Sequence, residues 1–187
     1  MSLNESETRA ELVDPALKDA EWGVEEGSRV RREFQINKGR IQVGGTRADP
    51  LFADYVLEHR GQRLAVLEAK KEALHVTEGL AQAKNYASKM SIRFAFATNG
   101  KDVYLADLDT GEEGLVDSYP TPDELWEMTF SEANEWRNQF AAVPFEDKGG
   151  AWQPRYYQQV AANRALEAIA QGDTRILLTL ATGTGKT

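Results

Sequence analysis

The sequence contains no cysteine and only two histidines, and these shortages exclude several kinds of site. Without cysteine there is no disulfide, no thiolate metal ligand and no cysteine nucleophile. A histidine-rich metal site is equally disfavoured, so any metal would be a hard cation held by carboxylates. The sequence also lacks an apolar run long enough to span a membrane and a charged-then-apolar leader. We therefore expect a cytoplasmic protein with no membrane partner.

The formal net charge of -8 argues against a uniformly basic nucleic-acid binder. It does not exclude local basic patches, and nucleases need acidic side chains to hold metal. Basic residues gather on both sides of Gly44–Gly45, where either a phosphate-contacting edge or a solvated surface fits the pattern; they are Arg29, Arg31, Arg32, Lys38, Arg40 and Arg47. With 187 residues, the chain can form one domain with a sizeable core and the start of another.

The last residues of the chain have the spacing of a phosphate-binding loop. The segment 181–187 follows directly on a strand-like apolar run at 176–180, and it contains Gly183, Gly185, Lys186 and Thr187. In such a loop backbone N–H groups point at the β-phosphate, so Lys186 would reach the β- and γ-phosphates and Thr187 would hold Mg²⁺. Because the helix that such a loop opens is missing, we expect a fragment of a larger nucleotide-driven protein that by itself binds ATP poorly.

Apolar patterns in the first part of the chain predict one helix and three strands. A capping-box pattern at Thr8–Glu11 predicts an N-terminal helix. Loose alternation predicts strands at 29–36 and 51–58. The nearly wholly apolar segment 64–67 fits a strand that is buried on both faces.

The middle of the chain predicts a second helix and two more strands. Apolar residues at spacings of four and three predict a helix at 76–90, and short strands follow at 94–98 and 103–107 around the turn Asn99–Gly100. This order predicts an α/β fold with a mixed sheet and helices on its faces.

The last third of the chain predicts a domain boundary. Thr121–Glu124 begins another helix, with proline at its first position. A connection rich in proline, glycine and charge follows, and then a helix from Pro154 to about Ala170 that Gly172 caps. We therefore predict a first domain at 1–143, a linker at 144–153 and the start of a second domain at 154–187.

The candidate catalytic residues lie on two neighbouring strands. Asp54 is in the middle of one strand, and Glu68-Ala69-Lys70 closes the buried strand that follows. A hairpin would bring Asp54 beside Glu68, and the two-residue period puts Glu68 and Lys70 on one face. The two acids could hold one or two Mg²⁺ ions, with the Ala69 carbonyl as a further ligand, for phosphodiester hydrolysis. Lys70 could stabilise the charge that develops on the phosphate.

A simpler interpretation of this triad is a surface salt bridge on a hairpin, because the pattern is short and charged residues are common. The position of Glu68 at the end of a core strand favours the catalytic interpretation. Gln82 and Tyr86 on the following helix are four residues apart, and we expect them to share a face away from its apolar stripe. They could support DNA or the active site through hydrogen bonds, or simply be exposed helix residues.

Taken together, these residues resemble a known family. Asp54, Glu68-Ala69-Lys70, Gln82 and Tyr86 resemble the PD-(D/E)XK nuclease domain at the N-terminus of the motor (R) subunit of type I restriction enzymes. In that family the nuclease precedes a superfamily 2 helicase-like translocase, and the segment Arg155–Gln158 followed by the phosphate loop resembles its start. The resemblance implies a restriction-endonuclease-like mixed sheet flanked by helices, then the truncated start of a RecA-like ATPase domain.

The sequence departs from the family pattern at two positions. Ala53 stands where the motif name has proline, and Leu180 stands where the strict phosphate-loop pattern has glycine or alanine. Both departures leave the chemically active residues in place.

The resemblance also implies an activity and partners. The activity is Mg²⁺-dependent endonucleolytic cleavage of double-stranded DNA, and the full-length protein would use ATP with Mg²⁺ for translocation, alongside specificity (S) and modification (M) subunits. By the same resemblance, Gln158 contacts adenine with support from Arg155, and Glu11 is an additional acid of the metal site. We do not expect ATPase activity from this chain alone.

Two other interpretations remain open at the level of sequence. The first is an inactive nuclease-like fold used as a docking or DNA-binding module at the N-terminus of a DNA helicase. The second is a helicase with an unrelated accessory domain, which a separation in space of Asp54 and Lys70 from Glu68 would favour. The chemical competence of all three residues favours the enzyme.

Overall fold

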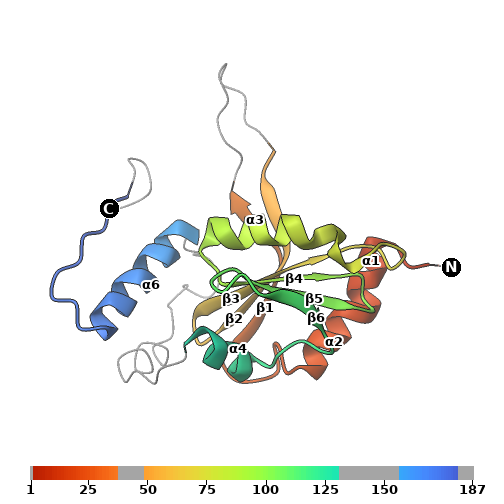
Figure 1. Cartoon of the computed structure of the whole chain (residues 1–187), viewed down its shortest axis with the longest axis horizontal. Coiled ribbons are helices and arrows are strands. Elements are labelled where there is room, and N and C mark those ends of the chain that lie inside the picture. The colour runs from red at the N-terminus through yellow and green to blue at the C-terminus, as the bar shows by residue number, and fades with distance from the viewer. Residues whose placement is uncertain (1, 38–48, 131–155, 181–187) are drawn as a thin grey trace, which may run out of the picture. The chain divides into compact units, whose positions relative to one another are not determined.

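The computed structural model describes residues 2–37, 49–130 and 156–180 (Figure 1). The chain divides into two compact units, one made of residues 1–59 and 63–131 and the other of residues 60–62 and 132–187. The predicted linker at 144–153 and the phosphate loop lie outside the described residues, so the predicted domain boundaries stay predictions. No helix in the described ranges is both long and apolar enough to cross a membrane.

The first unit is built on a six-stranded mixed sheet whose strands are neighbours in chain order. Strands β3 and β4 pair parallel, whereas β1 with β2, β4 with β5 and β5 with β6 pair antiparallel. The strands are β1 (Ser28–Asn37), β2 (Leu51–His59), β3 (Gln62–Ala69), β4 (Phe94–Thr98), β5 (Val103–Asp107) and β6 (Glu113–Val116). The predicted strands β1 to β5 are therefore confirmed, with ends that differ by no more than two residues.

The connection between β2 and β3 sets the register of the two strands that carry the candidate site. It consists of Arg60 and Gly61, whose φ angles of 50° and 74° both lie in the left-handed region. A two-residue turn of this type has the twist that suits a hairpin. A short turn restricts how the two strands can pair, and in this hairpin the Asp54 N–H lies 3.1 Å from Glu68 Oε1.

The parallel strands β3 and β4 need a crossover connection, which in such folds is right-handed, and a helix supplies it. The helix is α3 (Leu80–Met90), and one turn of 3₁₀ helix, η2 (Val76–Gly79), precedes it. The predicted helix at 76–90 is confirmed except that its first turn is 3₁₀. Figure 1 shows α3 along one face of the sheet, where its apolar stripe packs on the strands.

The N-terminal segment is helical, but its beginning differs from the prediction. Helix α1 (Glu5–Thr8) is followed by a π-helical turn, η1 (Arg9–Val13), and by α2 (Asp14–Asp19). Asn4 and Glu7 form the capping box, so the predicted box at Thr8–Glu11 is wrong. Thr8 cannot cap because it is buried inside the helical segment, where its hydroxyl accepts a hydrogen bond from the Glu72 backbone N–H at 3.2 Å.

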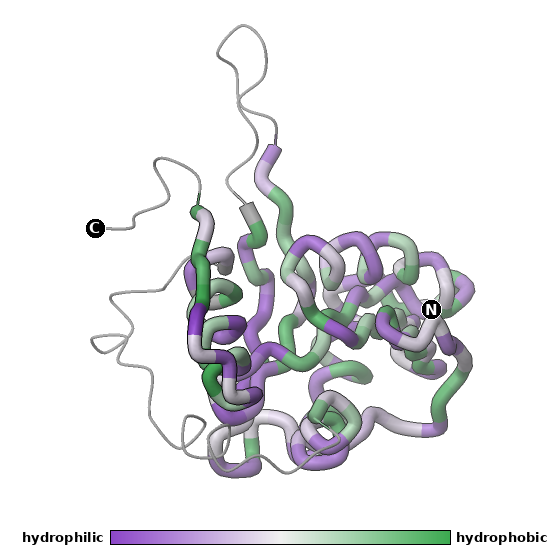
Figure 2. The backbone as a smooth tube through the Cα atoms, turned by 60° about the vertical axis from the view of Figure 1, so that its left-hand side comes forward, coloured by the Kyte–Doolittle hydropathy of each residue, from purple (hydrophilic) through white to green (hydrophobic). Residues whose placement is uncertain are grey.

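The opposite face of the sheet is covered by α2 and α4 (Pro122–Thr129) (Figure 1). Thr121 and Glu124 form the predicted capping box of α4. Strand β3 is buried on both faces, since no residue from Leu64 to Leu67 is more than 1% exposed. In Figure 2 the helices change from hydrophobic to hydrophilic and back several times along their length, as helices with one buried face do.

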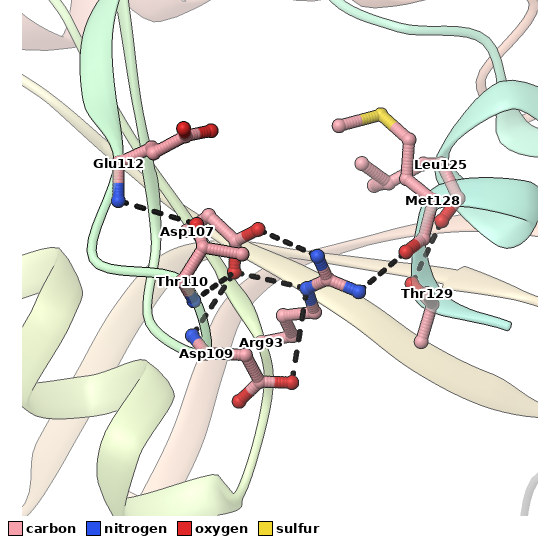
Figure 3. Close-up of polar contacts among 8 residues, drawn as sticks. All are labelled: Arg93, Asp107, Asp109, Thr110, Glu112, Leu125, Met128 and Thr129. Carbon is pink, nitrogen blue, oxygen red and sulfur yellow. Dashed lines mark hydrogen bonds and ion pairs between the residues drawn. The ribbon is translucent and has the colours of Figure 1, made fainter. Parts of the chain in front are cut away.

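A charged cluster around Arg93 links strand β5 to helix α4 (Figure 3). The Arg93 guanidinium donates two hydrogen bonds to the Asp107 carboxylate, at 2.9 and 2.6 Å, and a third to the Met128 carbonyl. Asp107 also accepts hydrogen bonds from the backbone N–H groups of Asp109 and Thr110, which shapes the turn into β6. Strand β6 was not predicted from the sequence, because a four-residue strand that contains glycine and is largely exposed shows no apolar alternation.

The second unit contains helix α6 (Tyr156–Ala170), as predicted. Gly172 ends it with φ at 88°, its N–H bonded to the Ile169 carbonyl while the Asp173 N–H bonds to the Ala168 carbonyl. This is the Schellman arrangement that glycine favours. The strand predicted at 176–180 is wrong: that segment has no regular structure, and Leu177 is 86% exposed. An apolar run becomes a strand only where a neighbour pairs with its backbone, and no described strand does so here.

Candidate active site

The β2–β3 hairpin lets each of two carboxylates accept a hydrogen bond from a backbone N–H of the other strand. The Asp54 N–H donates to Glu68 Oε1 at 3.1 Å, and the Ala69 N–H donates to Asp54 Oδ2 at 2.9 Å. Glu68 is 1% exposed, and the Asp54 side chain is 17% exposed. These reciprocal hydrogen bonds fix the rotamers of both acids, so the pair is ordered before any ligand arrives.

Lys70 continues from β3 toward helix α3. Its backbone N–H donates to the Thr98 carbonyl at 2.8 Å, which extends the pairing with β4. Its Nζ donates to Gln82 Oε1 at 3.2 Å, and Gln82 Nε2 donates to the Tyr86 hydroxyl at 3.1 Å. The separate predictions for Lys70, Gln82 and Tyr86 therefore meet in one chain of hydrogen bonds.

The position of Tyr86 differs from the prediction. We expected it away from the apolar stripe of the helix, but it is 7% exposed and packs with the core while its hydroxyl reaches Gln82. A tyrosine can do both, since its ring is apolar and only its tip is polar.

Gly79 allows helix α3 to approach the two charged residues closely, and the sequence analysis missed it. A Cβ atom at this position would lie 3.2 Å from Glu68 Cβ, 3.3 Å from the Glu68 carbonyl oxygen and 3.6 Å from Lys70 Cε. A side chain here would force strand β3 at Glu68 and the start of α3 apart by a few tenths of an ångström. The φ angle of Gly79 is ordinary, so no local sequence signal distinguishes it from other glycines.

Burial dominates the electrostatics of the acid pair. Burial, then the negative charge of Asp54 and to a smaller extent that of Glu5, raise the pKa of Glu68 to about 8, while the hydrogen bond from the Asp54 N–H and the Lys70 ammonium oppose the shift. In the absence of metal, a proton on Glu68 therefore relieves the repulsion between the two neighbouring acids. A cation between the carboxylates would also relieve it, and the oxygen-only donor set suits a hard ion such as Mg²⁺. The residues present therefore fit a divalent cation.

Arg9 is a second cation at the pair, and sequence reasoning did not identify it. Its Nη1 lies 3.2 Å from Asp54 Oδ1, and its Nη2 lies 3.5 Å from Glu33 Oε1. The two residues Arg9 and Asp54 are 45 positions apart, and no local pattern predicts their contact.

Glu11, the predicted additional acid, lies on the exposed side of the N-terminal helices. In the described part of the chain, no hydrogen bond or ion pair joins it to Asp54 or Glu68. The acid of this segment whose charge acts on Glu68 is Glu5, six residues earlier.

A second group with metal-binding chemistry lies at the end of β2. Ligand atoms of Glu25, His59 and Asp123 all lie within 4.8 Å of one another, close enough to share an ion. His59 is fully buried, with Nε2 3.0 Å from Asp123 Oδ1 and its ring edge-on to Trp126. Burial, then the charge of Asp123, raises the pKa of Glu25, while His59 opposes the shift. Asp54 and His59 are an odd number of residues apart on β2, so this group is on the other face of the sheet.

The predicted nucleotide-binding residues are largely outside the described ranges. Gln158 lies on α6 and is half-buried. Arg155, Gly183, Gly185, Lys186 and Thr187 are in segments that the structure does not describe.

Comparisons with known proteins agree with this architecture. The family model for the N terminus of the type I restriction enzyme R protein matches residues 26–120, and the model for the res subunit of type III restriction enzymes matches residues 151–187. The chain is 34% identical over 199 residues to the EcoAI type I restriction endonuclease subunit of Escherichia coli, which covers all of this chain and 24% of that protein.

Two further relatives extend the comparison. The EcoKI type I restriction endonuclease subunit of Escherichia coli K12 is 27% identical over 251 residues, covering 100% of this chain and 21% of that protein. A solved fragment assigned to an HsdR subunit of a type I restriction enzyme from Vibrio vulnificus YJ016 superposes with a TM-score of 0.79 at 38% identity, covering 100% of this chain and 36% of that one. The chain thus spans about a quarter or less of its curated relatives, and its predicted α/β fold with a mixed sheet is confirmed.

Proposed function

Because this chain belongs to the type I restriction enzyme R-protein family, whose N-terminal region it carries, we propose that its six-stranded unit is a DNA endonuclease. The proposed reaction is Mg²⁺-dependent hydrolysis of a phosphodiester bond in double-stranded DNA. The observation that carries this proposal is the contact between Asp54 and Glu68, two acids whose carboxylates each accept a hydrogen bond from a backbone N–H of the other strand, from Ala69 and from Asp54 respectively. Two neighbouring carboxylates repel each other and destabilise the fold, but together they can bind a divalent cation.

Asp54, Glu68 and the Ala69 carbonyl would hold the metal. When bound, Mg²⁺ would polarise the scissile phosphate and lower the pKa of an attacking water. Glu68 must lose its proton to bind a cation, since its pKa is raised while the site is free of metal. Lys70 would face the phosphate and stabilise its developing charge, and Gln82 would orient the Lys70 ammonium through the 3.2 Å hydrogen bond. Tyr86 would in turn fix Gln82.

We further propose that the second unit begins the ATP-driven part of a longer protein. The family match at residues 151–187 supports this assignment. Arg155, Gln158, Gly183, Gly185, Lys186 and Thr187 would bind ATP with Mg²⁺ there, by the logic of the phosphate loop. The partners of the longer protein would be double-stranded DNA and the specificity and modification subunits of a type I complex. Since DNA is the substrate, we place the protein in the cytoplasm.

The test uses the full-length R protein in its complex and separates cleavage from ATP hydrolysis. Asp54→Asn, Glu68→Gln and Lys70→Met should each lower DNA cleavage at least ~10³-fold, because each removes a metal ligand or the cation that faces the phosphate. ATP hydrolysis should stay within about twofold of wild type, since the roles lie in different units.

Glu58→Gln is the matched control for these variants. Glu58 is a buried acid on the same face of β2 as Asp54, but its carboxylate is paired with Arg31 at 3.0 Å and with Arg63 at 3.2 Å. This control should keep cleavage. Full cleavage by Asp54→Asn would refute the nuclease proposal and favour the alternative of an inactive docking or DNA-binding module. The separation of Asp54 and Lys70 from Glu68 that would have favoured an unrelated accessory domain is not found.

A further inference from the structure

Arg9 contacts the acid pair through Asp54. Its guanidinium contacts Asp54 Oδ1, an atom that a metal ion would also need, while Asp54 Oδ2 is already bonded to the Ala69 N–H. The Arg9 side chain is 22% exposed, so it is neither a core residue nor a freely solvated one. Its second partner, Glu33, is 72% exposed and offers only a weak, screened contact.

The backbone around Arg9 is held in place by contacts on both sides. Thr8 is fully buried and accepts from the Glu72 N–H, and the Leu3 N–H donates to Glu72 Oε2 at 2.9 Å. The same helical turn packs directly on Gly100, where a Cβ would lie 2.8 Å from Thr8 Cγ2. Arg9 is therefore presented to the site by a fixed segment, with little conformational freedom left to lose.

A π-helical turn starts at Arg9 and closes with the hydrogen bond from the Asp14 N–H to the Arg9 carbonyl. Such a turn accommodates one extra residue and changes the face on which later side chains lie. Here it lets Val13 and Leu17 pack into the core while Arg9 reaches Asp54. Isolated π-turns are rare and concentrate at functional sites, which supports a functional role for Arg9.

The charges at the site change when a divalent ion is bound. Two ionised carboxylates, Asp54 and Glu68, balance one divalent cation. Arg9 and Lys70 then have no partner in the pair, and two cations face the place where substrate must lie. A phosphodiester is the counterion that fits, and a guanidinium binds phosphate oxygens through two parallel hydrogen bonds.

We propose that Arg9 is a phosphate-binding residue of this active site, which pairs with Asp54 in the metal-free protein and passes to the scissile phosphate when the metal binds. The proposal rests on the nuclease function proposed above. Distance supports it, because a group 3.2 Å from a metal-ligand oxygen lies within reach of a phosphate on the same metal. It makes two predictions of opposite sign for one substitution.

The first measurement is the Mn²⁺ affinity of this chain, by calorimetric titration. Arg9→Gln should bind Mn²⁺ about fivefold more tightly than wild type, because the ion no longer displaces a guanidinium from Asp54. If Arg9 merely held Asp54 in position, the same substitution would leave Mn²⁺ affinity unchanged or weaken it. Either of those results overturns the proposal.

The second measurement is single-turnover DNA cleavage at saturating Mn²⁺ by the full-length R protein in its complex. Arg9→Gln should lower the rate about 100-fold, as loss of one group that stabilises transition-state charge does. Arg9→Lys should lower it about tenfold, because lysine keeps the charge but loses the bidentate geometry. A rate for Arg9→Gln within threefold of wild type would also overturn the proposal.

Arg32→Gln is the matched control, since Arg32 forms a comparable ion pair with Asp14 at 2.8 Å. It should change neither measurement. If Arg9→Gln does not fold, the cleavage rate of Arg9→Lys tests the proposal instead. A rate for Arg9→Lys equal to that of wild type would then overturn the proposal. Failure of the proposed function is recognised separately: Asp54→Asn would then bind Mn²⁺ and cut DNA like the wild type.

Discussion

Two buried glutamates lie in the same β2–β3 hairpin, and their neighbours give them opposite properties. Glu58 is 7% exposed and is neutralised by two arginines, Arg31 and Arg63. Glu68 is 1% exposed and meets another acid, Asp54. The negative charge of Glu58 is thus neutralised within the protein. The two acids at Glu68 repel each other, and a bound cation would neutralise them. Burial alone does not mark a functional acid; the sign of its nearest neighbours does.

The largest effect on stability is expected at Glu58. Glu58→Ala should lower the free energy of unfolding by about 3 kcal/mol, because it leaves the Arg63 guanidinium buried without its partner. Arg63 is sensitive to this loss, since burial lowers its pKa and Glu58 opposes that shift. Chemical denaturation measures the change. The double variant Glu58→Leu with Arg63→Met should recover most of the lost stability, and no recovery would mean that the ion pair is not the cause.

At Glu68 the effect should depend on pH and have the opposite sign. The pKa of Glu68 in the folded, metal-free protein, about 8, lies above its ordinary value, so the folded state binds the proton more tightly than the unfolded state. Its contribution to stability is therefore full at pH 4 and is lost as pH rises through 8. Glu68→Gln should be more stable than wild type by about 2 kcal/mol at pH 9, and similar to it at pH 4.

Thermal melts in a chelator across this pH range test the prediction, with Glu58→Gln as the control that shows no such gain at high pH. With saturating Mg²⁺ the advantage of Glu68→Gln at pH 9 should disappear, because the ion stabilises the ionised wild type. A pH-independent difference between Glu68→Gln and wild type would contradict the account of the acid pair.

The smallest effect is expected at Asp107, a third acid, which is paired with Arg93 in the manner of Glu58 (Figure 3). Its hydrogen bonds with the Arg93 guanidinium lower its pKa to about 2. The stability it contributes is present above its ordinary pKa and is lost as pH falls toward 2. Asp107→Asn should lower the free energy of unfolding by about 1 kcal/mol at pH 7, and by less at pH 2. An equal loss at both values would exclude the ion pair as the source.

Much of the sheet could be predicted from the sequence, because its strands carry strong local signals. The apolar run Leu64–Leu67 indicates a strand buried on both faces, and the hairpin then places Asp54 beside Glu68. The cap of α4 at Thr121 and the end of α6 at Gly172 also depend only on adjacent residues.

The features that could not be predicted depend on long-range contacts. The Arg9 contact with Asp54 needs the N-terminal helices to be placed first, and the π-helical turn that aims Arg9 has no sequence signal. Gly79 matters only because another strand passes beneath it. Conversely, the apolar run at 176–180 carried a strand signal without a described strand to pair with it.

The central claim is that Asp54 and Glu68 form one metal site, and a Mn²⁺ titration of this chain tests it most directly. The account predicts binding by wild type, binding by Glu58→Gln, and loss of that binding in Asp54→Asn and Glu68→Gln. His59→Ala reports separately on the cluster of Glu25, His59 and Asp123, and it should leave the binding at Asp54 intact. Equal Mn²⁺ binding by wild type, Asp54→Asn and Glu68→Gln would contradict the account.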